Sequence, residues 1–212
     1  MIVIVDYGMG NLRSVHKGFE KVGFPAVVTQ DPGSIRKASG LVLPGVGAFK
    51  KAMENLTELG LVEPIKEFIA GGKPFLGICL GLQLLFSESE EFGMQSGLGI
   101  FAGRVVRFPF SNPGSPPTRD SLKVPHMGWN AVQLQKRVPI LEGIEDGVHF
   151  YFVHSYYPSP DDRDIVATTT DYGGEFVSSI SRGKLFACQF HPEKSQAVGL
   201  KILRNFGTLV HP

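Results

Sequence analysis

Cys79 is the residue of this sequence whose setting most suggests chemistry. It stands between Gly77 and Gly81, where an apolar segment changes into a helix-like run, LGICLGLQLLF. A strand that turns abruptly into a helix between small residues exposes the side chain at the turn, as in a nucleophile elbow. The positive end of the new helix favours the thiolate, which is the nucleophilic form. The alternative is a buried structural thiol, because free cysteine is among the most buried residue types.

His191 and Glu193 could complete a nucleophilic site, since a nucleophile needs a base and the base needs a group that orients it. His191 ends the apolar segment LFACQF and begins HPEKS. Pro192 holds φ at about −65° and keeps the chain extended, so that residues two apart face the same way. Glu193 is therefore expected beside the His191 imidazole. The alternative for Glu193 is a helix N-terminus, where its carboxylate would complement the helix dipole.

Cys188 and the other histidines are interpreted as structural or surface residues. Cys188 lies in the middle of FACQF with no elbow, and is expected in the core. His149 and His154 belong to the predicted strand HFYFVHSYY, where partnered strand histidines are expected. His16 and His211 are expected in solvent. Cys188 therefore serves as the control for Cys79.

The elements that must position these residues alternate between apolar runs and helical patterns. Continuous apolar runs are typical of strands buried on both faces, and their alternation with helices predicts βαβ units. The fold class is therefore α/β, with a mostly parallel central sheet flanked by helices. The predicted strands cover 2–6, 26–30, 40–45 and 74–79, and the predicted helices cover 12–23, 48–59, 62–70 and 80–89.

The second half of the chain changes character. Between Gly99 and Phe190 most segments favour strands, which predicts antiparallel β additions to the parallel sheet. The segment SNPGSPPTRDS over 111–121 contains three prolines and no periodicity, and is predicted as a surface loop. An amphipathic helix is predicted over 194–210.

Composition bounds the possible functions. A chain of 212 residues can bury one substantial core, so a single domain over 1–212 is expected. Lys and Arg number 21 against 20 Asp and Glu, which leaves no charge excess for nucleic acid or a membrane surface. Two cysteines are too few for a disulfide framework, and the apolar start MIVIV is too short for a signal or membrane segment. A soluble, cytoplasmic protein is expected.

Five motifs resemble the class I (triad) glutamine amidotransferases, which hydrolyse glutamine and pass on ammonia. GICLGLQLLF and FACQFHPEKS are similar to motifs of the whole class. VDYGMGNLRSV, LPGVGAF and PHMGWN resemble the branch that serves histidine biosynthesis. The motifs occur in collinear order over nearly the whole chain. The resemblance implies a flavodoxin-like sheet, with Cys79, His191 and Glu193 as the catalytic triad and no cofactor or metal.

The resemblance also implies how the substrate is held. The oxyanion of the tetrahedral intermediate would bind two backbone N–H groups, of Leu80 and Val46. L-Glutamine would contact Gly45, Gly47, Gln83, Glu91, Ser155 and Tyr156. Gln83 lies four residues after Cys79, so both can reach one ligand from one helix face. Gln83 could instead be an ordinary helix-surface residue, and Glu91 a solvated charge in SESEE.

A protein partner is implied because free ammonia is protonated in water. Members of this branch dock on a separate (β/α)8-barrel cyclase and pass ammonia through a tunnel. A typical barrel needs about 250 residues, so it must be another chain. The residues that match the docking face of the branch are Tyr7, Asn11, Trp129 and Lys194. Without the other motifs, PHMGWN would be a glycine turn with a core tryptophan.

Three other functions are compatible with parts of the pattern. Another glutaminase of the class, such as a pyridoxal phosphate synthase partner, is disfavoured by PHMGWN. A cysteine peptidase-like or chaperone-like relative with an elbow cysteine is disfavoured by HPE after a late strand. A regulatory module with a vestigial triad is disfavoured because Cys79, His191 and Glu193 are all present. Release of ammonia from glutamine would separate these possibilities.

Overall fold

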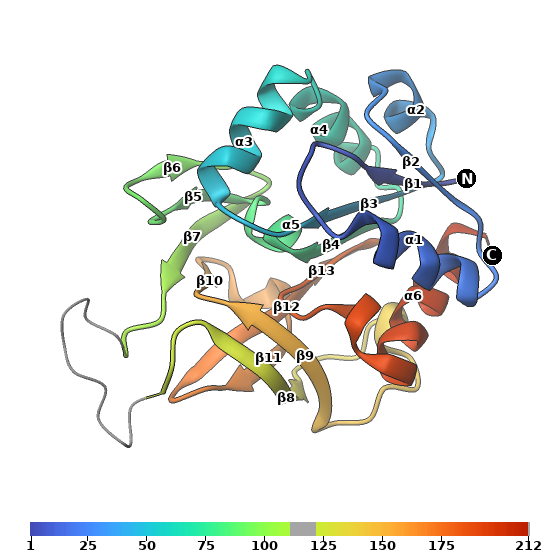
Figure 1. Cartoon of the computed structure of the whole chain (residues 1–212). Coiled ribbons are helices and arrows are strands. Elements are labelled where there is room, and N and C mark those ends of the chain that lie inside the picture. The colour runs from blue at the N-terminus through green and yellow to red at the C-terminus, as the bar shows by residue number, and fades with distance from the viewer. Residues whose placement is uncertain (111–121, 212) are drawn as a thin grey trace.

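The computed structural model describes residues 1–110 and 122–211 of the chain (Figure 1). The loop predicted over 111–121 lies outside the described residues. The two ends of the described chain lie on the same side of the molecule (Figure 1). Within the described residues, no helix combines the length and the apolar character needed to cross a lipid bilayer.

A nine-stranded sheet forms the centre of the fold, in the order β2-β1-β3-β4-β13-β12-β11-β8-β9. The first five strands of this order are mutually parallel: β2 Ala26–Thr29, β1 Ile2–Val5, β3 Gly40–Gly45, β4 Phe75–Cys79 and β13 Leu185–Cys188. The remaining four pair antiparallel: β12 Glu175–Arg182, β11 Val166–Asp171, β8 His126–Leu134 and β9 Val148–His154. The predicted α/β class, with a parallel sheet extended by antiparallel strands, is confirmed.

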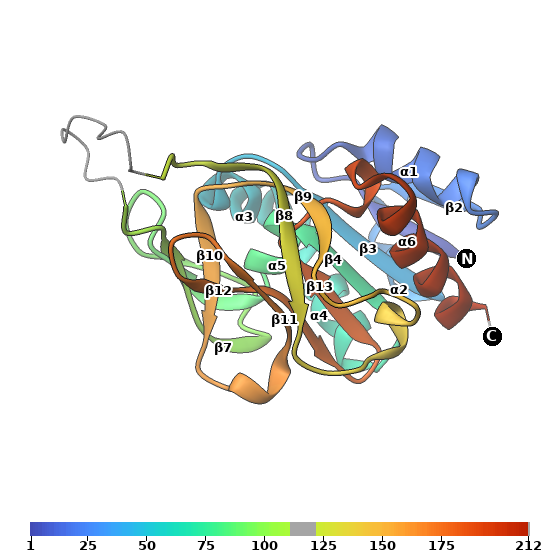
Figure 2. The same cartoon turned by 90° about the horizontal axis from the view of Figure 1, so that it is seen from below.

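Helices cover both faces of the parallel part of the sheet (Figures 1 and 2). On one face pack α1 Leu12–Lys21 and α6 Gln196–Val210, and on the other pack α2 Pro32–Lys37, α3 Phe49–Glu58 and α4 Val62–Ala70. The packing of strand β1 explains why all of its residues are apolar. Ile2 and Ile4 join the cluster with α1 and α6, whereas Val3 and Val5 join the cluster with α3 and α4. Both faces of the strand are buried because side chains alternate along it.

The helix predicted over 80–89 is much shorter in the structure. Only Leu80–Gln83 is helical, as α5, and Phe86–Ser89 forms strand β5 of a second sheet. That sheet runs β10 Tyr156–Pro160, β7 Phe101–Arg107, β5 and β6 Gln95–Ser96. The prediction was wrong because Leu84, Leu85 and Phe86 are all fully buried, and a run that is apolar on every side carries no period that separates helix from strand.

Two other segments differ from the prediction, and a third excludes an alternative. The strand expected over 149–157 is divided at Ser155, so that β9 and β10 enter different sheets. The segment HPE is not extended: Pro192–Lys194 forms a 3₁₀ turn, η3, which suits a proline at its first position. PHMGWN continues into strand β8 and forms no glycine turn around a buried tryptophan. Two further short turns, η1 Pro139–Leu141 and η2 Arg163–Ile165, connect strands.

The parallel strands bring the ends of three distant segments to one edge of the sheet. Gly45 at the end of β3 pairs with Cys79 at the end of β4, and Cys188 at the end of β13 pairs with Ile78. Ligands of open α/β sheets bind at the carboxyl ends of their strands. The site is therefore expected where β3, β4 and β13 end together.

Candidate active site

Cys79 occupies the sharp turn between β4 and α5. Its φ of 54° and ψ of −107° are unusual for a residue with a Cβ, and it is the N-cap of the four-residue helix. The flanking glycines are required by space. A Cβ on Gly81 would overlap the carbonyl oxygen of Leu43, and a Cβ on Gly77 would lie 2.8 Å from the Cβ of Ala187. Strained backbone of this kind persists where the surroundings enforce it, which is typical of active sites. The turn has the geometry of a nucleophile elbow.

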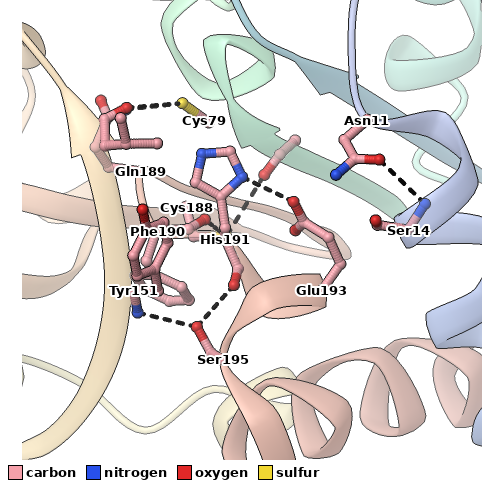
Figure 3. Close-up of polar contacts among 12 residues, drawn as sticks. Asn11, Ser14, Cys79, Tyr151, Cys188, Gln189, Phe190, His191, Glu193 and Ser195 are labelled. Carbon is pink, nitrogen blue, oxygen red and sulfur yellow. Dashed lines mark hydrogen bonds and ion pairs between the residues drawn. The ribbon is translucent and has the colours of Figure 1, made fainter. Parts of the chain in front are cut away.

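His191 and Glu193 lie side by side beyond the end of β13. The His191 Nδ1 is 2.8 Å from the Glu193 Oε1, and both side chains are about 1% exposed. The other ring nitrogen, Nε2, is buried without a hydrogen-bond partner in the described residues, and the ring stands between Cys79 and Glu193 (Figure 3). The turn at Pro192, and not an extended chain, brings the carboxylate back to the imidazole. The two side chains lie close together, as predicted, but the backbone between them forms a 3₁₀ turn where an extended chain was expected.

The charges of its neighbours hold a proton on His191. Burial alone lowers the pKa of this imidazole, but the thiolate of Cys79 and the hydrogen-bonded carboxylate of Glu193 raise it to about 10. His191 is therefore an imidazolium at neutral pH when Cys79 is a thiolate. Helix α5 is only four residues long, so this imidazolium is the main partner that can stabilise a thiolate here. The arrangement combines a nucleophile with an acid that can protonate a leaving group.

Cys188 has the opposite character. Its thiol is fully buried, lies within hydrogen-bond reach of the carbonyl oxygens of Gly77 and Phe190, and has a pKa raised by burial. A thiol of this kind is inert. The structure agrees with its interpretation as a core residue.

A pocket of about 250 Å³ opens in front of the Cys79 sulfur. Its size suits a small amino acid better than a large cofactor. The pocket is lined by seven of the predicted oxyanion and substrate residues, and Gly45 and His191 are not among its lining residues. The lining consists of Val46, Gly47, Cys79, Leu80, Gln83, Glu91, Pro125, Val153, His154, Ser155 and Tyr156.

Gln83 and Glu91 are not solvated surface residues. The Gln83 side chain is buried, and its Nε2 donates to the carbonyl oxygen of Tyr156 at 2.9 Å and to the Gln189 Oε1 at 3.0 Å. One oxygen of Glu91 accepts from the backbone N–H of Phe49 at 2.6 Å and so caps α3 from outside the helix. Both side chains line the pocket, and each keeps one oxygen that no described hydrogen bond uses.

Three site residues were not predicted to act in the site: Gln189 and His126, which lie in the motifs quoted above, and His154, which was expected only as a partnered strand histidine. Gln189 is fully buried and donates from Nε2 to the Cys79 Sγ at 3.5 Å. His126 and His154 form a buried pair, with Nδ1 of the first 3.0 Å from Nε2 of the second. Burial lowers their pKa values to about 4 and about 3, so both are neutral at physiological pH.

The residues predicted for docking do not all reach the surface. Trp129 is 46% exposed and packs edge-on against Tyr151, whose ring also carries the Lys194 ammonium at 5.8 Å. Asn11 is partly exposed and caps α1. Tyr7, in contrast, is fully buried, with its hydroxyl near Gly45 and without a hydrogen-bond partner among the described residues. Its side chain offers no surface to a partner in this structure, and the docking role of Tyr7 stays a prediction.

Comparisons with known proteins agree with this geometry. Residues 3–209 match the model of the family "Glutamine amidotransferase class-I". The chain is 58% identical over 209 residues to the imidazole glycerol phosphate synthase subunit HisH of Syntrophotalea carbinolica, covering 99% of this chain and 100% of that protein. It is 56% identical to the subunit of the same name from Geobacter sulfurreducens, covering 98% of each. A crystal structure of a glutamine amidotransferase superposes with a TM-score of 0.75 at 19% identity, covering all of both chains.

Proposed function

The chain belongs to the class I glutamine amidotransferases, and we propose that it is the glutaminase subunit of imidazole glycerol phosphate synthase, which supplies ammonia for histidine biosynthesis. The observation that carries the proposal is Cys79 at an elbow with φ of 54°, in front of a His191–Glu193 pair joined at 2.8 Å. These are the three positions that the family resemblance assigns to the triad. The substrate is L-glutamine, and no cofactor takes part.

The protons of the reaction balance between Cys79, His191 and water. The Cys79 thiolate attacks the side-chain amide carbon of glutamine and forms a tetrahedral oxyanion. The His191 imidazolium then gives its proton to the amide nitrogen, which leaves as ammonia, and a glutamyl thioester remains. Neutral His191 next takes a proton from water, whose oxygen attacks the thioester. The tetrahedral intermediate expels the Cys79 thiolate, the new carboxyl group releases the second water proton to solvent as glutamate leaves, and the thiolate–imidazolium pair is restored. Glu193 orients the imidazole and stabilises its charged form.

Backbone and side chains of the pocket would hold the rest of the substrate. The N–H of Leu80 is the first of α5 and has no acceptor within the helix, so it can donate to the oxyanion together with that of Val46. Both hydrogens of Gln83 Nε2 are used inside the protein, which leaves its Oε1 for the substrate. Glu91 supplies a carboxylate for the α-ammonium group, and Ser155 and Tyr156 supply backbone N–H groups for the α-carboxylate.

The ammonia product requires a partner next to the pocket. We propose that a (β/α)8-barrel cyclase subunit docks over the strand ends through Asn11, Trp129 and Lys194. Trp129 and Lys194 both contact Tyr151, whose ring centroid lies 6.4 Å from that of His191. No role for nucleic acid or membrane is proposed. A cytoplasmic location fits the chemistry, because Cys79 and Cys188 are free thiols and a catalytic thiolate must stay reduced. A single domain over 1–212 fits the two hydrophobic clusters, which lie on opposite faces of one sheet.

Glutamine hydrolysis tests the proposal directly. The purified chain should bind a barrel cyclase, and ammonia release from glutamine should rise when the cyclase and its ligand are added. Asparagine should not replace glutamine at the same concentration, because the pocket must seat the α-amino acid group and the amide together. A chain that hydrolyses no glutamine with its cyclase partner bound would contradict the proposed function.

Glu193→Gln is expected to move the alkaline limb of the pH profile to lower pH. Glu193 raises the pKa of His191, so its neutral replacement lets the imidazolium lose its proton at lower pH than about 10. The alkaline limb of the variant should lie at lower pH than that of the wild type. The measurement is kcat at saturating glutamine from pH 6 to pH 11, since kcat reports groups in the enzyme–substrate complex, whereas kcat/KM would also report the free α-ammonium group of glutamine.

Glu67→Gln is the matched control for the Glu193 prediction. Glu67 is half-exposed and pairs with Arg36 on the surface between α2 and α4. Its loss should leave the alkaline limb in place. If the alkaline limb lies at the same pH in the wild type, Glu193→Gln and Glu67→Gln, then Glu193 does not raise the pKa of His191.

Trp129→Ala is expected to weaken cyclase binding by about 30-fold or more. Truncated aromatic hot spots commonly cost about 2 kcal/mol or more, and about 1.4 kcal/mol corresponds to a tenfold change in Kd. The exposed ring contacts Tyr151 but is not part of the buried core, so the melting temperature should change little. Titration calorimetry measures the binding, and Leu59→Ala is the control. Leu59 is 37% exposed at the end of α3, on the opposite edge of the sheet. Equal affinities of the two variants would reject Trp129 as a docking residue.

A further inference from the structure

Gln189 bridges the nucleophile and the substrate pocket, although neither the motifs nor the triad assigns it a role. It is completely buried just beyond β13, and its backbone N–H donates to Ser178 on β12. Its side chain reaches the Cys79 Sγ with Nε2 at 3.5 Å and accepts from Gln83 with Oε1 at 3.0 Å. Gln189 and Cys79 lie close together in Figure 3. An amide in this position stabilises a thiolate only when its NH₂ group, and not its oxygen, faces the sulfur.

That amide lies at the end of a chain of hydrogen bonds, which we call the amide relay. It runs from Asn130 through His126, His154, the Tyr156 carbonyl and Gln83 to Gln189. The register of β8 and β9 places His126 directly opposite His154. At the far end the Asn130 amide is itself fixed, because Nδ2 donates to the carbonyl of Asp171 and Oδ1 accepts from Ala131.

The ring nitrogen that carries the hydrogen in each histidine of the relay follows from the group it contacts. The Tyr156 carbonyl can only accept, so the His154 Nδ1, 2.8 Å away, carries a hydrogen. A neutral His154 then has a bare Nε2, which must accept from the His126 Nδ1. The His126 Nε2 in turn accepts from the Asn130 Nδ2 at 3.3 Å. This assignment satisfies every ring nitrogen with both histidines neutral, in agreement with pKa values lowered to about 4 and about 3 by burial.

The relay continues through two amides. The second lone pair of the Tyr156 carbonyl accepts from the Gln83 Nε2 at 2.9 Å. The other hydrogen of that nitrogen goes to the Gln189 Oε1. The Gln189 Nε2 is therefore turned toward Cys79. If Gln83 reversed its amide, its oxygen would oppose the Tyr156 carbonyl, and Gln189 would lose the donor that fixes its direction.

We propose that Gln189 is a positioning residue for the Cys79 sulfur, and that the part of the amide relay from the Tyr156 carbonyl through Gln83 sets the direction in which its amide donates. It donates to the sulfur from Nε2 at 3.5 Å. One consequence concerns the substrate: the same relay leaves the Gln83 Oε1 as the atom that faces the pocket, so the nucleophile and the substrate acceptor are fixed together. The kinetic part of the test rests on the proposed function, whereas the chemical part does not.

Alkylation of Cys79 tests the proposal without glutamine. The full-length chain is treated with iodoacetamide across a pH series, and the peptide that contains Cys79 is quantified by mass spectrometry. Gln189→Glu keeps the acceptor for Gln83 but replaces the donor with a negative charge. The midpoint of alkylation should rise by about 1–2 pH units, the size expected when a hydrogen bond to a charged group is lost. Gln189→Met removes the donor without adding charge, and should give a smaller shift in the same direction.

Ser178→Ala is the matched control. Ser178 is fully buried on the strand next to Gln189, and its hydroxyl bonds to that of Thr168, 2.8 Å away. The control should lose stability as the Gln189 variants do, yet keep the wild-type midpoint. In steady-state hydrolysis with the cyclase bound, Gln189→Met should lower kcat by about 10–100-fold and change KM much less. Midpoints of both Gln189 variants equal to that of Ser178→Ala would overturn the proposal.

A double-mutant cycle separates the relay from Gln189 itself. Gln83→Met keeps a side chain of similar length but removes the donor that fixes the direction of the Gln189 amide. Alone it should shift the alkylation midpoint in the same direction as Gln189→Met. Added to Gln189→Met it should cause no further shift, since there is then no amide to direct. Equal shifts in the two backgrounds would show that the relay does not act through Gln189. If alkylation behaves as expected but the wild-type complex hydrolyses no glutamine, the proposed function fails while Gln189 keeps its role.

Discussion

Cys79→Ala is expected to abolish glutamine-dependent synthesis by the complex while activity with added ammonium salts stays nearly intact. Removing the nucleophile of a triad costs on the order of 10⁴–10⁶ in kcat, because the remaining groups have nothing to activate. The cyclase chemistry lies in the other chain, so ammonia from solution can still reach it. The measurement compares the two nitrogen sources at saturating cyclase substrate, with the variant bound to its partner.

Cys188→Ala is the control that distinguishes the two thiols. Cys188 is completely buried, and removing its sulfur should cost stability and little activity. The variant should therefore keep glutamine hydrolysis within a few-fold of the wild type at a temperature where it stays folded. If a folded Cys188→Ala variant loses hydrolysis and Cys79→Ala keeps it, the nucleophile has been assigned to the wrong cysteine.

The parts of the site that could be predicted are those whose geometry is local in sequence. The elbow depends on Gly77 and Gly81 beside Cys79, and the histidine–carboxylate pair spans three residues. The parallel sheet followed from apolar runs such as IVIV, which is buried on both faces. These features need only a period or a spacing, so the sequence predicts them even though η3 replaces the extended chain expected at Pro192.

The parts that could not be predicted depend on register and on burial. His126 and His154 meet because β8 and β9 pair antiparallel with those two residues opposite, and a slip of one residue would have sent them to different faces. Gln189 gains its role from strands β4 and β13, which are far apart in the sequence. Tyr7 was assigned to a docking face from its motif, whereas its ring fills the core beneath Gly45. No spacing rule gives these contacts.

Val46, in the segment between β3 and α3, is expected to limit the glutaminase rate of the isolated chain. Val46 occupies the place where many class I amidotransferases have glycine, and its N–H is the second donor proposed for the oxyanion. In the described residues the non-glycine positions with positive φ are Cys79, Phe92 and Gln196, so Val46 keeps a negative φ, whereas Gly47 has φ of 101°. Turning the Gly45–Val46 peptide over changes φ of Val46 toward positive values. A β-branched residue there costs about 1–3 kcal/mol.

We therefore expect the isolated chain to be a poor glutaminase, with a resting Gly45–Val46 peptide whose carbonyl, not its N–H, faces the site. Only contacts that differ between the two states can turn the peptide, and the cyclase holding its own substrate is the natural source. A coupling of about 1–3 kcal/mol corresponds to roughly 5–150-fold activation, and one oxyanion donor can be worth about 10²–10³ in rate. Partner and cyclase ligand should accordingly raise kcat far more than they lower KM.

Val46→Gly should raise the basal kcat and shrink the activation, because glycine takes a positive φ at little cost. The rate of the liganded complex should change little, since the peptide is already turned there. Ala48→Gly, two residues later, adds flexibility to the same segment without touching the peptide that turns, and should leave both rates as they are. The decisive comparison is kcat for glutamine hydrolysis by each chain alone and with the liganded cyclase. A wild-type chain that works as fast alone as in the complex would rule out this switch, and so would an Ala48→Gly variant that matches Val46→Gly.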